Sequence, residues 1–322
     1  MLHRHVKLVK KGVPCRLYYY FSFIGYHLHN NIMIRKLFFI ETWTLAVTSD
    51  YSNIENIDKC NWKVLKPGFF EYFADPSIVT VDNNNKMIEI VYESIKYFTG
   101  KGYLKKLNYS SQKNEILKTK IILENKNHIS FPNIYKFQDK QILLYENEEE
   151  KKLGIKEYTK NCLHEFKDIE GEYLDPIIAE INKNQYLISS YRNNSKLIFN
   201  IQLVNDAFDL KSSDIKYREN KKCIRNGGKI IVDNSEIFRI GQLNNGRYGE
   251  GLVFNKLIQN NNEIIEKNYY TLLPSDLNQK FTGLHTFSCY ENICVIDVRI
   301  IKFNPIAVII KLLRRLRKYG KR

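Results

Sequence analysis

Short apolar runs separated by polar turns cover the chain from about residue 38 to residue 303. The runs include LFFIETWTLAV, PSIVTV, KMIEIVYES, QILLYEN, PIIAEI, QYLISSY, KIIVD, EIFRIGQ and ICVIDVRI, and the turns include DNNNK, INKNQ, YRNNSK and VDNSE. Strands at this spacing, with few convincing long amphipathic helices before residue 305, predict an all-β sandwich, barrel or propeller.

A pair of strands joined by a polar turn recurs four times, at intervals of about fifty residues, which is near the length of a propeller blade. The pairs are PSIVTV-DNNN-KMIEIVYES, PNIYKF-QD-KQILLYEN, PIIAEI-NKN-QYLISSY and KIIV-DNS-EIFRIGQ. A fifth unit combines GLHTFSCYENICVIDVRI with the early strand ETWTLAV, which closes the ring. We therefore predict a five-bladed β-propeller over residues 38–303, an N-terminal extension over residues 1–37 and a basic amphipathic helix over residues 304–322.

Polar residues occupy matching positions in these units. The first strand of each blade lines the central channel of a propeller, so residues at its start converge on one face of the ring. The residues before the inner strands are Asp75, His128, Asp175, Arg225 and His285, and those at the ends of second strands are Glu93, Glu146, Arg192, Arg239 and Gln242. The pattern predicts one funnel that gathers acids, histidines and arginines.

Each acidic candidate also has a purely structural explanation. Asp75 and Asp175 precede proline, where aspartate often only forms a turn. Glu93 and Glu146 lie on apolar strands, where a carboxylate must find a partner or shift its pKa. Either glutamate could be a general acid or a structural acid paired with arginine.

The remaining candidates have two explanations as well. His128 and His285 suit a sugar hydroxyl or phosphate, or the capping of a turn. Arg225 and Arg239 suit bidentate contact with a diphosphate or carboxylate, or a salt bridge between blades. Arg192 belongs to the same predicted funnel. Gln242 and Tyr248 could complete a sugar site or merely pack.

Composition excludes a disordered chain, because 43% of the 322 residues are hydrophobic and 26% are charged. The net charge is +15, and eight basic residues without an acid in residues 301–322 make up about half of that excess. A nucleic-acid interaction would rest mainly on this tail, and we do not predict one.

The tail itself reads FNPIAVIIKLLRRLRKYGKR, in which Pro305 suits the start of a helix. The apolar residues at helical spacing are Ile306, Ile309, Ile310, Leu313 and Leu316, with Lys311, Arg314, Arg315 and Lys318 mostly elsewhere. Such a helix suits peripheral contact with an anionic membrane. Packing on its own domain, with the charges solvated, is the alternative.

The compartment follows from what the sequence lacks. No stretch reaches the roughly 18 apolar residues that span a bilayer. The N-terminal apolar run is interrupted and has no obvious cleavage site, so we expect no signal peptide. The six cysteines are scattered without a CxxC pair, so neither zinc nor a disulfide framework is expected. We expect a cytoplasmic protein, peripheral at the inner face of the membrane.

The sequence also lacks GxGxxG after a strand, a P-loop, GxSxG and HExxH. We therefore predict neither a cofactor nor a catalytic metal.

An ordered set of motifs over roughly residues 40–300 resembles a known family. The motifs are FADPSIV, IVYES, HISFP, LLYEN, YLDPII, RNGGKII, IFRIGQ, RYGEGLVFNKLI and GLHTFS. The set resembles the N-terminal propeller domain of glucosamine inositolphosphorylceramide transferases, which is related to arabinanases, invertases and levansucrases. The resemblance implies a five-bladed propeller, and for Asp75 a role as base or nucleophile at an anomeric carbon.

The chain departs from the family pattern at three places. Arg225-Asn226-Gly227-Gly228 stands where members usually have RPAG. Arg239–Leu243 lacks the acid of RPAQD, which removes a third carboxylate there. Leu144-Tyr145-Glu146 keeps the acid of a YMIPE-like stretch but loses its proline.

The leading hypothesis is a hydrolase-like glycosyltransferase of bacterial surface polysaccharide (capsule or lipopolysaccharide) biosynthesis. Asp75, Glu146 and Asp175 would be catalytic, and an activated sugar donor and a glycan or lipid-linked acceptor would be the partners. A glycoside hydrolase acting on furanosides and a non-catalytic carbohydrate-binding propeller are the alternatives. Fold kinship alone does not separate these three.

Overall fold

The computed structural model describes residues 36–320, apart from residues 85, 160–161, 182, 214, 245 and 261–262. The predicted extension over residues 1–37 lies almost wholly outside the described residues. By contacts the chain divides into two compact units, one of residues 42–300 and one of residues 1–41 and 301–322.

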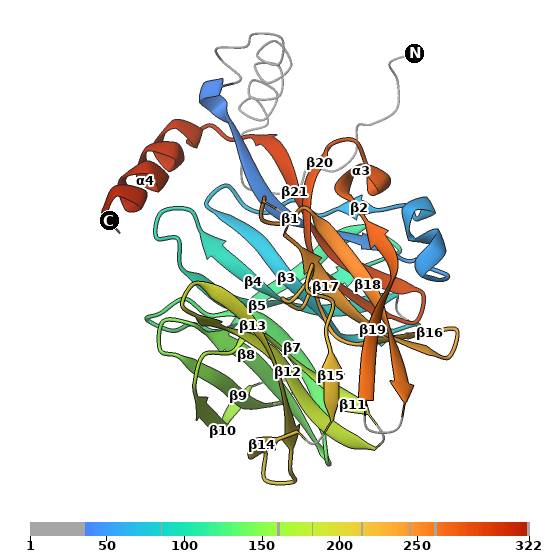
Figure 1. Cartoon of the computed structure of the whole chain (residues 1–322). Coiled ribbons are helices and arrows are strands. Elements are labelled where there is room, and N and C mark those ends of the chain that lie inside the picture. The colour runs from blue at the N-terminus through green and yellow to red at the C-terminus, as the bar shows by residue number, and fades with distance from the viewer. Residues whose placement is uncertain are drawn as a thin grey trace. The chain divides into compact units, whose positions relative to one another are not determined.

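Within the described residues, twenty-one strands form five sheets, which confirms the prediction of a five-bladed propeller (Figure 1). Blade one contains β3 (Glu71–Asp82), β4 (Met87–Lys96), β5 (Gly102–Ser110) and β6 (Glu115–Leu123). Blade two contains β7 (Ser130–Phe137), β8 (Lys140–Asn147), β9 (Lys152–Tyr158) and β10 (Leu163–Glu170). Blade three contains β11 (Leu174–Ile181), β12 (Asn184–Asn193), β13 (Lys196–Val204) and β14 (Leu210–Ser212).

The last two blades depart from a simple meander. Blade four contains β16 (Ile231–Asp233), β17 (Glu236–Leu243), β18 (Gly251–Asn260) and β19 (Glu263–Leu272), and β15 (Lys216–Arg218) pairs with β19 in parallel. Blade five joins β20 (Phe281–Tyr290) and β21 (Ile293–Phe303) to the early strands β1 (Phe39–Thr48) and β2 (Lys63–Val64). The predicted closure by ETWTLAV is therefore confirmed.

Apolar side chains fill the spaces between neighbouring blades. In the described part of the chain they form five clusters, one at each boundary between blades. Leu45 and Val295 of blade five, for example, pack with Ile90 and Leu107 of blade one. Because residues alternate across a strand, one face of each blade meets the blade before it and the other face meets the blade after it. This packing fixes the inner strands around one axis.

The short helices η1 (Ile54–Lys59) and α3 (Pro274–Leu277) lie between strands. The predicted C-terminal helix is present as α4 (Ala307–Gly320). The backbone N–H groups of Ile306 and Ala307 donate to the side-chain and main-chain oxygens of Asn304, which begins the helix.

The helix differs from the expected single apolar face. Ile310 is fully buried, whereas Ile309 and Leu316 are more than half exposed, together with Leu312. In the part of the chain that the structure describes, no helix combines the length and apolar character needed to cross a bilayer.

One pair of cysteines was not anticipated. Cys289 and Cys294 form a disulfide, because they are direct partners in the ladder of the β20–β21 hairpin. This disulfide joins two residues across the tight turn of one hairpin. It does not cross-link distant parts of the chain, as a disulfide framework would.

Candidate active site

A β-bulge at the same place in four inner strands shapes the centre of the ring. The ladders of β3, β7, β11 and β20 skip residues 75–76, 131–132, 175–176 and 285–286. Asp75, Phe131 and Asp175 have positive φ values of 47°, 52° and 47°. Bulges turn side chains out of the regular alternation. The Asp-Pro and Phe-Pro pairs of the sequence therefore mark the points where the inner strands present residues to the axis.

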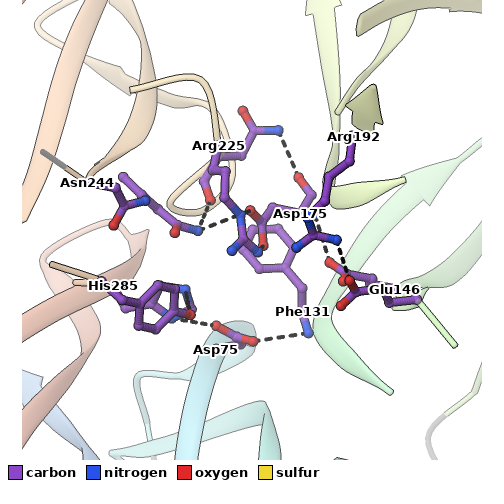
Figure 2. Close-up of polar contacts among 12 residues, drawn as sticks. Asp75, Phe131, Glu146, Asp175, Arg192, Arg225, Asn244 and His285 are labelled. Carbon is purple, nitrogen blue, oxygen red and sulfur yellow. Dashed lines mark hydrogen bonds and ion pairs between the residues drawn. The ribbon is translucent and has the colours of Figure 1, made fainter. Parts of the chain in front are cut away.

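These residues open onto one cavity of about 370 Å³. Its lining includes eight of the eleven predicted site residues, namely Asp75, Glu93, His128, Glu146, Asp175, Arg225, Tyr248 and His285. Figure 2 shows Asp75, Asp175, Arg225 and His285 converging from different blades. The structure thus brings together groups that lie more than two hundred residues apart in sequence.

Asp75 is a buried carboxylate with basic and amide partners. Its Oδ1 lies 3.0 Å from Nδ1 of His285, and its Oδ2 accepts the backbone N–H of Phe131 at 3.2 Å (Figure 2). Burial opposes ionisation, but the positive charge and hydrogen bond of His285, a hydrogen bond with Glu93 and the charge of Arg225 hold its pKa below the usual range. Asp75 is therefore an ionised carboxylate that lines the cavity.

His285 lies between two carboxylates. Asp297 accepts the backbone N–H groups of His285 and Thr286 at 3.1 and 2.7 Å, and its Oδ2 lies 3.1 Å from Nδ1 of His285. Burial opposes the charge of the ring, but Asp75 and Asp297 raise its pKa to about 10. An imidazolium donates from both nitrogens, so Nδ1 serves the carboxylates and Nε2 serves the hydroxyl of Tyr248.

Glu93 and His128 form a second pair in the cavity. Nε2 of His128 lies 3.0 Å from Oε1 of Glu93, and Nδ1 accepts the backbone N–H of Gly102 at 2.9 Å. Although burial opposes a charged ring, Glu93 raises the pKa of His128 to about 9. A second proton would occupy Nδ1, so full protonation of the ring would break the hydrogen bond from the Gly102 N–H.

The contact between Glu93 and His128 explains why residue 102 is glycine. It also bears on the raised pKa of Glu93. A Cβ on Gly102 would lie 2.1 Å from Oε1 of Glu93, so only glycine permits this close approach. Burial and the negative charge of Asp75 raise the pKa of Glu93 to about 7, while the hydrogen bond from His128 opposes the shift.

Glu146 is a second buried acid of the cavity. Burial and the charge of Asp175 raise its pKa to about 8, against the opposing charge of Arg225. Its Oε2 accepts the backbone N–H of Asp175 at 2.9 Å. Glu146 therefore carries a proton at neutral pH and has the properties of a general acid.

Asp175 is held by Arg225 through two hydrogen bonds of 2.5 and 2.7 Å. Burial raises the pKa of Asp175 above its usual value, although the charge and hydrogen bonds of Arg225 oppose the shift. Arg225 has its own pKa raised by the same contact. Because arginine keeps its charge and the contact is bidentate, Arg225 is the group that stabilises the ionised form of Asp175.

Three predicted residues lie outside the cavity lining. Arg239 has no exposed side-chain surface, and its guanidinium contacts Glu266 and the carbonyl of Cys223. It cannot contact a substrate here, which corrects its assignment as a binding residue. Gln242 is also buried and donates to Asp175 at 3.2 Å, and Arg192 pairs with Glu148 at the edge of the site.

Asp297 and Trp43 belong to the site but were not predicted from the sequence. Asp297 is fully buried beneath His285 and also accepts the N–H of Asp75 at 3.1 Å. It belongs to the second strand of blade five, as Glu93 and Glu146 belong to the second strands of their blades. An acid inside the apolar run ICVIDVRI was the available signal. Trp43 of β1 lines the cavity and contacts the ring of Tyr248.

Asp75, His285 and Asp297 also form a group that could hold a metal ion, with ligand atoms within 4.8 Å of one another. Both carboxylates already contact Nδ1 of His285, and Asp297 accepts three backbone N–H groups. A cation would have to displace the Nδ1 proton, so these residues fit an ion-paired cluster better than a metal centre.

The chain is thus a five-bladed β-propeller with several carboxyl groups in one central cavity. The family described as glucosamine inositolphosphorylceramide transferase 1, N-terminal, matches residues 60–280. Because this match covers more than half of the chain, the chain belongs to that family. A comparison with curated protein sequences finds no match.

Several solved structures are similar in fold. An exo-beta-1,3-galactanase from Phanerochaete chrysosporium, bound to beta-1,3-galactotriose, is 9% identical with a TM-score of 0.51, over 84% of this chain and 65% of that one. A beta-xylosidase/alpha-arabinofuranosidase from a compost microbial metagenome is 12% identical with a TM-score of 0.49, over 74% and 92%. A Bombyx mori beta-fructofuranosidase is 10% identical with a TM-score of 0.47, over 65% and 54%. At these identities the likeness concerns the fold alone.

Proposed function

We propose that the chain is a hydrolase-like glycosyltransferase that transfers a sugar from an activated donor to a glycan or lipid-linked acceptor during bacterial surface polysaccharide biosynthesis. The family to which the chain belongs carries the name of a transferase, which supports transfer over hydrolysis. We further propose that it acts in the cytoplasm, at the inner face of the membrane.

One observation carries the proposal, namely that two buried carboxyl groups of different protonation state face one cavity. Asp75 is held ionised, and Glu146 is held protonated with a pKa of about 8. Sugar transfer passes through a transition state with positive charge at the anomeric carbon. An ionised Asp75 stabilises that charge or attacks the carbon, while Glu146 donates a proton to the leaving group. The acceptor hydroxyl then forms the new bond to the anomeric carbon and gives its proton to the deprotonated Glu146.

Arg225 is the cation that we assign to the phosphate of the donor. It lines the cavity, and its side chain is 18% exposed even though it holds Asp175. Arg239, the other arginine considered from the sequence, is enclosed.

The test is nucleotide release from a panel of nucleotide sugars, measured with and without a glycan acceptor. Release that requires the acceptor supports transfer. The variant Asp75→Asn keeps the shape of the side chain and removes its charge, so the rate should fall by about a thousandfold or more. Unchanged activity in this variant, with the fold intact, would overturn the assignment of Asp75.

Glycoside hydrolysis is the second candidate, favoured by the name and fold of the galactanase with which the chain aligns over 84% of its length. A hydrolase would release sugar from aryl glycosides in water without an acceptor or a nucleotide, and Asp75→Asn should abolish that reaction too. A non-catalytic binding propeller would release nothing, and its affinity for glycans would be the same before and after the Asp75→Asn substitution.

A further inference from the structure

Helix α4 carries apolar side chains on two sides. Ala307 and Ile310 are fully buried, whereas Ile309, Leu312 and Leu316 are 51%, 57% and 58% exposed. Residues three and four positions apart lie on the same face of a helix, so the last three form one stripe. We call Ile309, Leu312 and Leu316 the outer stripe. The buried side already anchors the helix, so the outer stripe is a second apolar surface.

Basic residues share the helix with the outer stripe. At about 3.6 residues per turn, Arg315 borders the stripe beside Leu312, whereas Lys311 and Arg314 lie on the opposite side of the helix. Arg314 and Arg315 are both exposed. Lys311 donates to the carbonyl of Leu37 at 3.3 Å, and Arg314 donates to the carbonyl of Glu41 at 3.3 Å. The sequence of residues 304–322 contains no acid, so the segment that carries the outer stripe is strongly basic.

From this stripe and these charges we propose that α4 binds the surface of a bilayer that contains anionic lipids. A helix of this length spans roughly 21 Å, too short for the hydrocarbon core, so it lies in the plane of the interface. The outer stripe enters the boundary between head groups and acyl chains, and the cations contact lipid phosphates. The surface differs from the propeller cavity, and the proposed reaction does not depend on it.

Charge and apolarity together favour a membrane over other partners. Nucleic acid would use the cations but gains little from a stripe of Ile309, Leu312 and Leu316. A second copy of the chain would cover the stripe but would bring two strongly basic helices together, which repel. An anionic bilayer satisfies both features.

The test is flotation of the full-length protein with vesicles of phosphatidylcholine alone or mixed with phosphatidylglycerol. We expect binding only to the anionic vesicles and loss of binding at high salt. Arg315→Ser should weaken binding about fivefold, at about 1 kcal/mol for the cation. Leu312→Ser with Leu316→Ser should weaken it about tenfold or more.

The matched control is Leu117→Ser with Lys118→Ser, which removes an exposed leucine and an exposed cation from β6. Its binding should equal that of the unchanged protein. Equal binding to neutral vesicles would overturn the proposal, as would leucine variants that bind like the control. The proposal is also overturned if the protein binds no vesicles and instead forms a dimer that the leucine variants dissociate. Binding of the tail to nucleic acid alone would overturn it as well.

Discussion

Glu146 and Glu93 are both acids with raised pKa values, and either could supply the proton in the proposed reaction. Their surroundings separate them. Glu146 contacts the backbone of Asp175, while Glu93 is tied to His128 and shares a hydrogen bond with Asp75. A glutamate already committed to a histidine and an aspartate is better suited to holding Asp75 than to donating to a leaving group.

The pH dependence of kcat/KM distinguishes these two glutamates. Because the acid must be protonated, activity should fall as the pH rises through about 8, the pKa of Glu146. Glu146→Gln should lower the rate about a hundredfold or more and remove this alkaline limb. If kcat/KM instead falls near pH 7, and this fall disappears in Glu93→Gln, the general acid is Glu93, whose pKa is about 7.

For single residues, the sequence predicted which residue types form the site better than it predicted the directions in which their side chains point. Asp75, Glu146 and Asp175 stood out because they interrupt apolar strands at repeated positions. Arg239 and Gln242 both lie on β17 but are three residues apart, so they point to opposite faces of the strand. The sequence alone does not say which face meets the cavity. Asp297 was missed because no turn or proline marks its place in β21.

Among the elements, blade four is held by a buried ion pair between β17 and β19. Arg239 and Glu266 have fully buried side chains, and Glu266 also accepts from the hydroxyl of Tyr217 at 2.6 Å and the N–H of Asn220 at 2.7 Å. Breaking such a pair leaves one charge uncompensated in the interior, which is more costly than replacing both partners. The arginine therefore orders the blade and shapes the site only indirectly.

Glu266→Gln should lower the free energy of unfolding by about 3–5 kcal/mol, measured by urea denaturation. The double variant Arg239→Met with Glu266→Leu should lose less, because it leaves no unpaired charge. Lys96→Met serves as the surface control, because Lys96 and Glu124 form an exposed ion pair worth about 1 kcal/mol or less. A double variant less stable than Glu266→Gln would contradict this account.

The strand pairs were predictable because each one combines an alternating pattern with a turn of Asn, Asp or Lys. The short parallel strand β15 and the helix η1 were not predicted, since each has too few residues to show a period. Neither element contributes a residue to the cavity lining.

At the scale of the whole molecule, the central charges couple stability to pH. Glu93 and Glu146 have pKa values raised from 4.5 to about 7 and about 8, and His285 has its pKa raised from 6.5 to about 10. In each case the folded state holds a proton that the unfolded state releases, so stability falls as the pH rises. Burial lowers the pKa values of Lys229 and Lys302 to about 8. Above pH 8 the folded state has therefore released protons that the unfolded state still holds, and this contribution raises stability as the pH rises.

The free energy of unfolding should therefore decrease between about pH 4.5 and about pH 8, with a shallower slope above that range. Denaturant titrations at several pH values measure it. Glu146→Gln should flatten the decrease, whereas Glu115→Gln, a change of an exposed acid on β6, should leave it unchanged. Stability that stays constant over this range, or rises, would contradict the protonation states assigned to the cavity.

The ring closure and the five-blade count were predictable because the repeat has a constant length and an unpaired early strand remained. The depth of the cavity and its pKa values were not, because burial depends on how all five blades pack together.

Ring closure by β1 has a practical consequence for anyone who trims this protein. The stretch that matches the family, residues 60–280, omits β1, β20 and β21. A fragment cut at those limits would lack His285 and Asp297 and would carry only four complete blades. It would leave the flanks of blades one and four uncovered, with apolar side chains facing water. Such a fragment should precipitate, and its inactivity would say nothing about the chemistry of the intact ring.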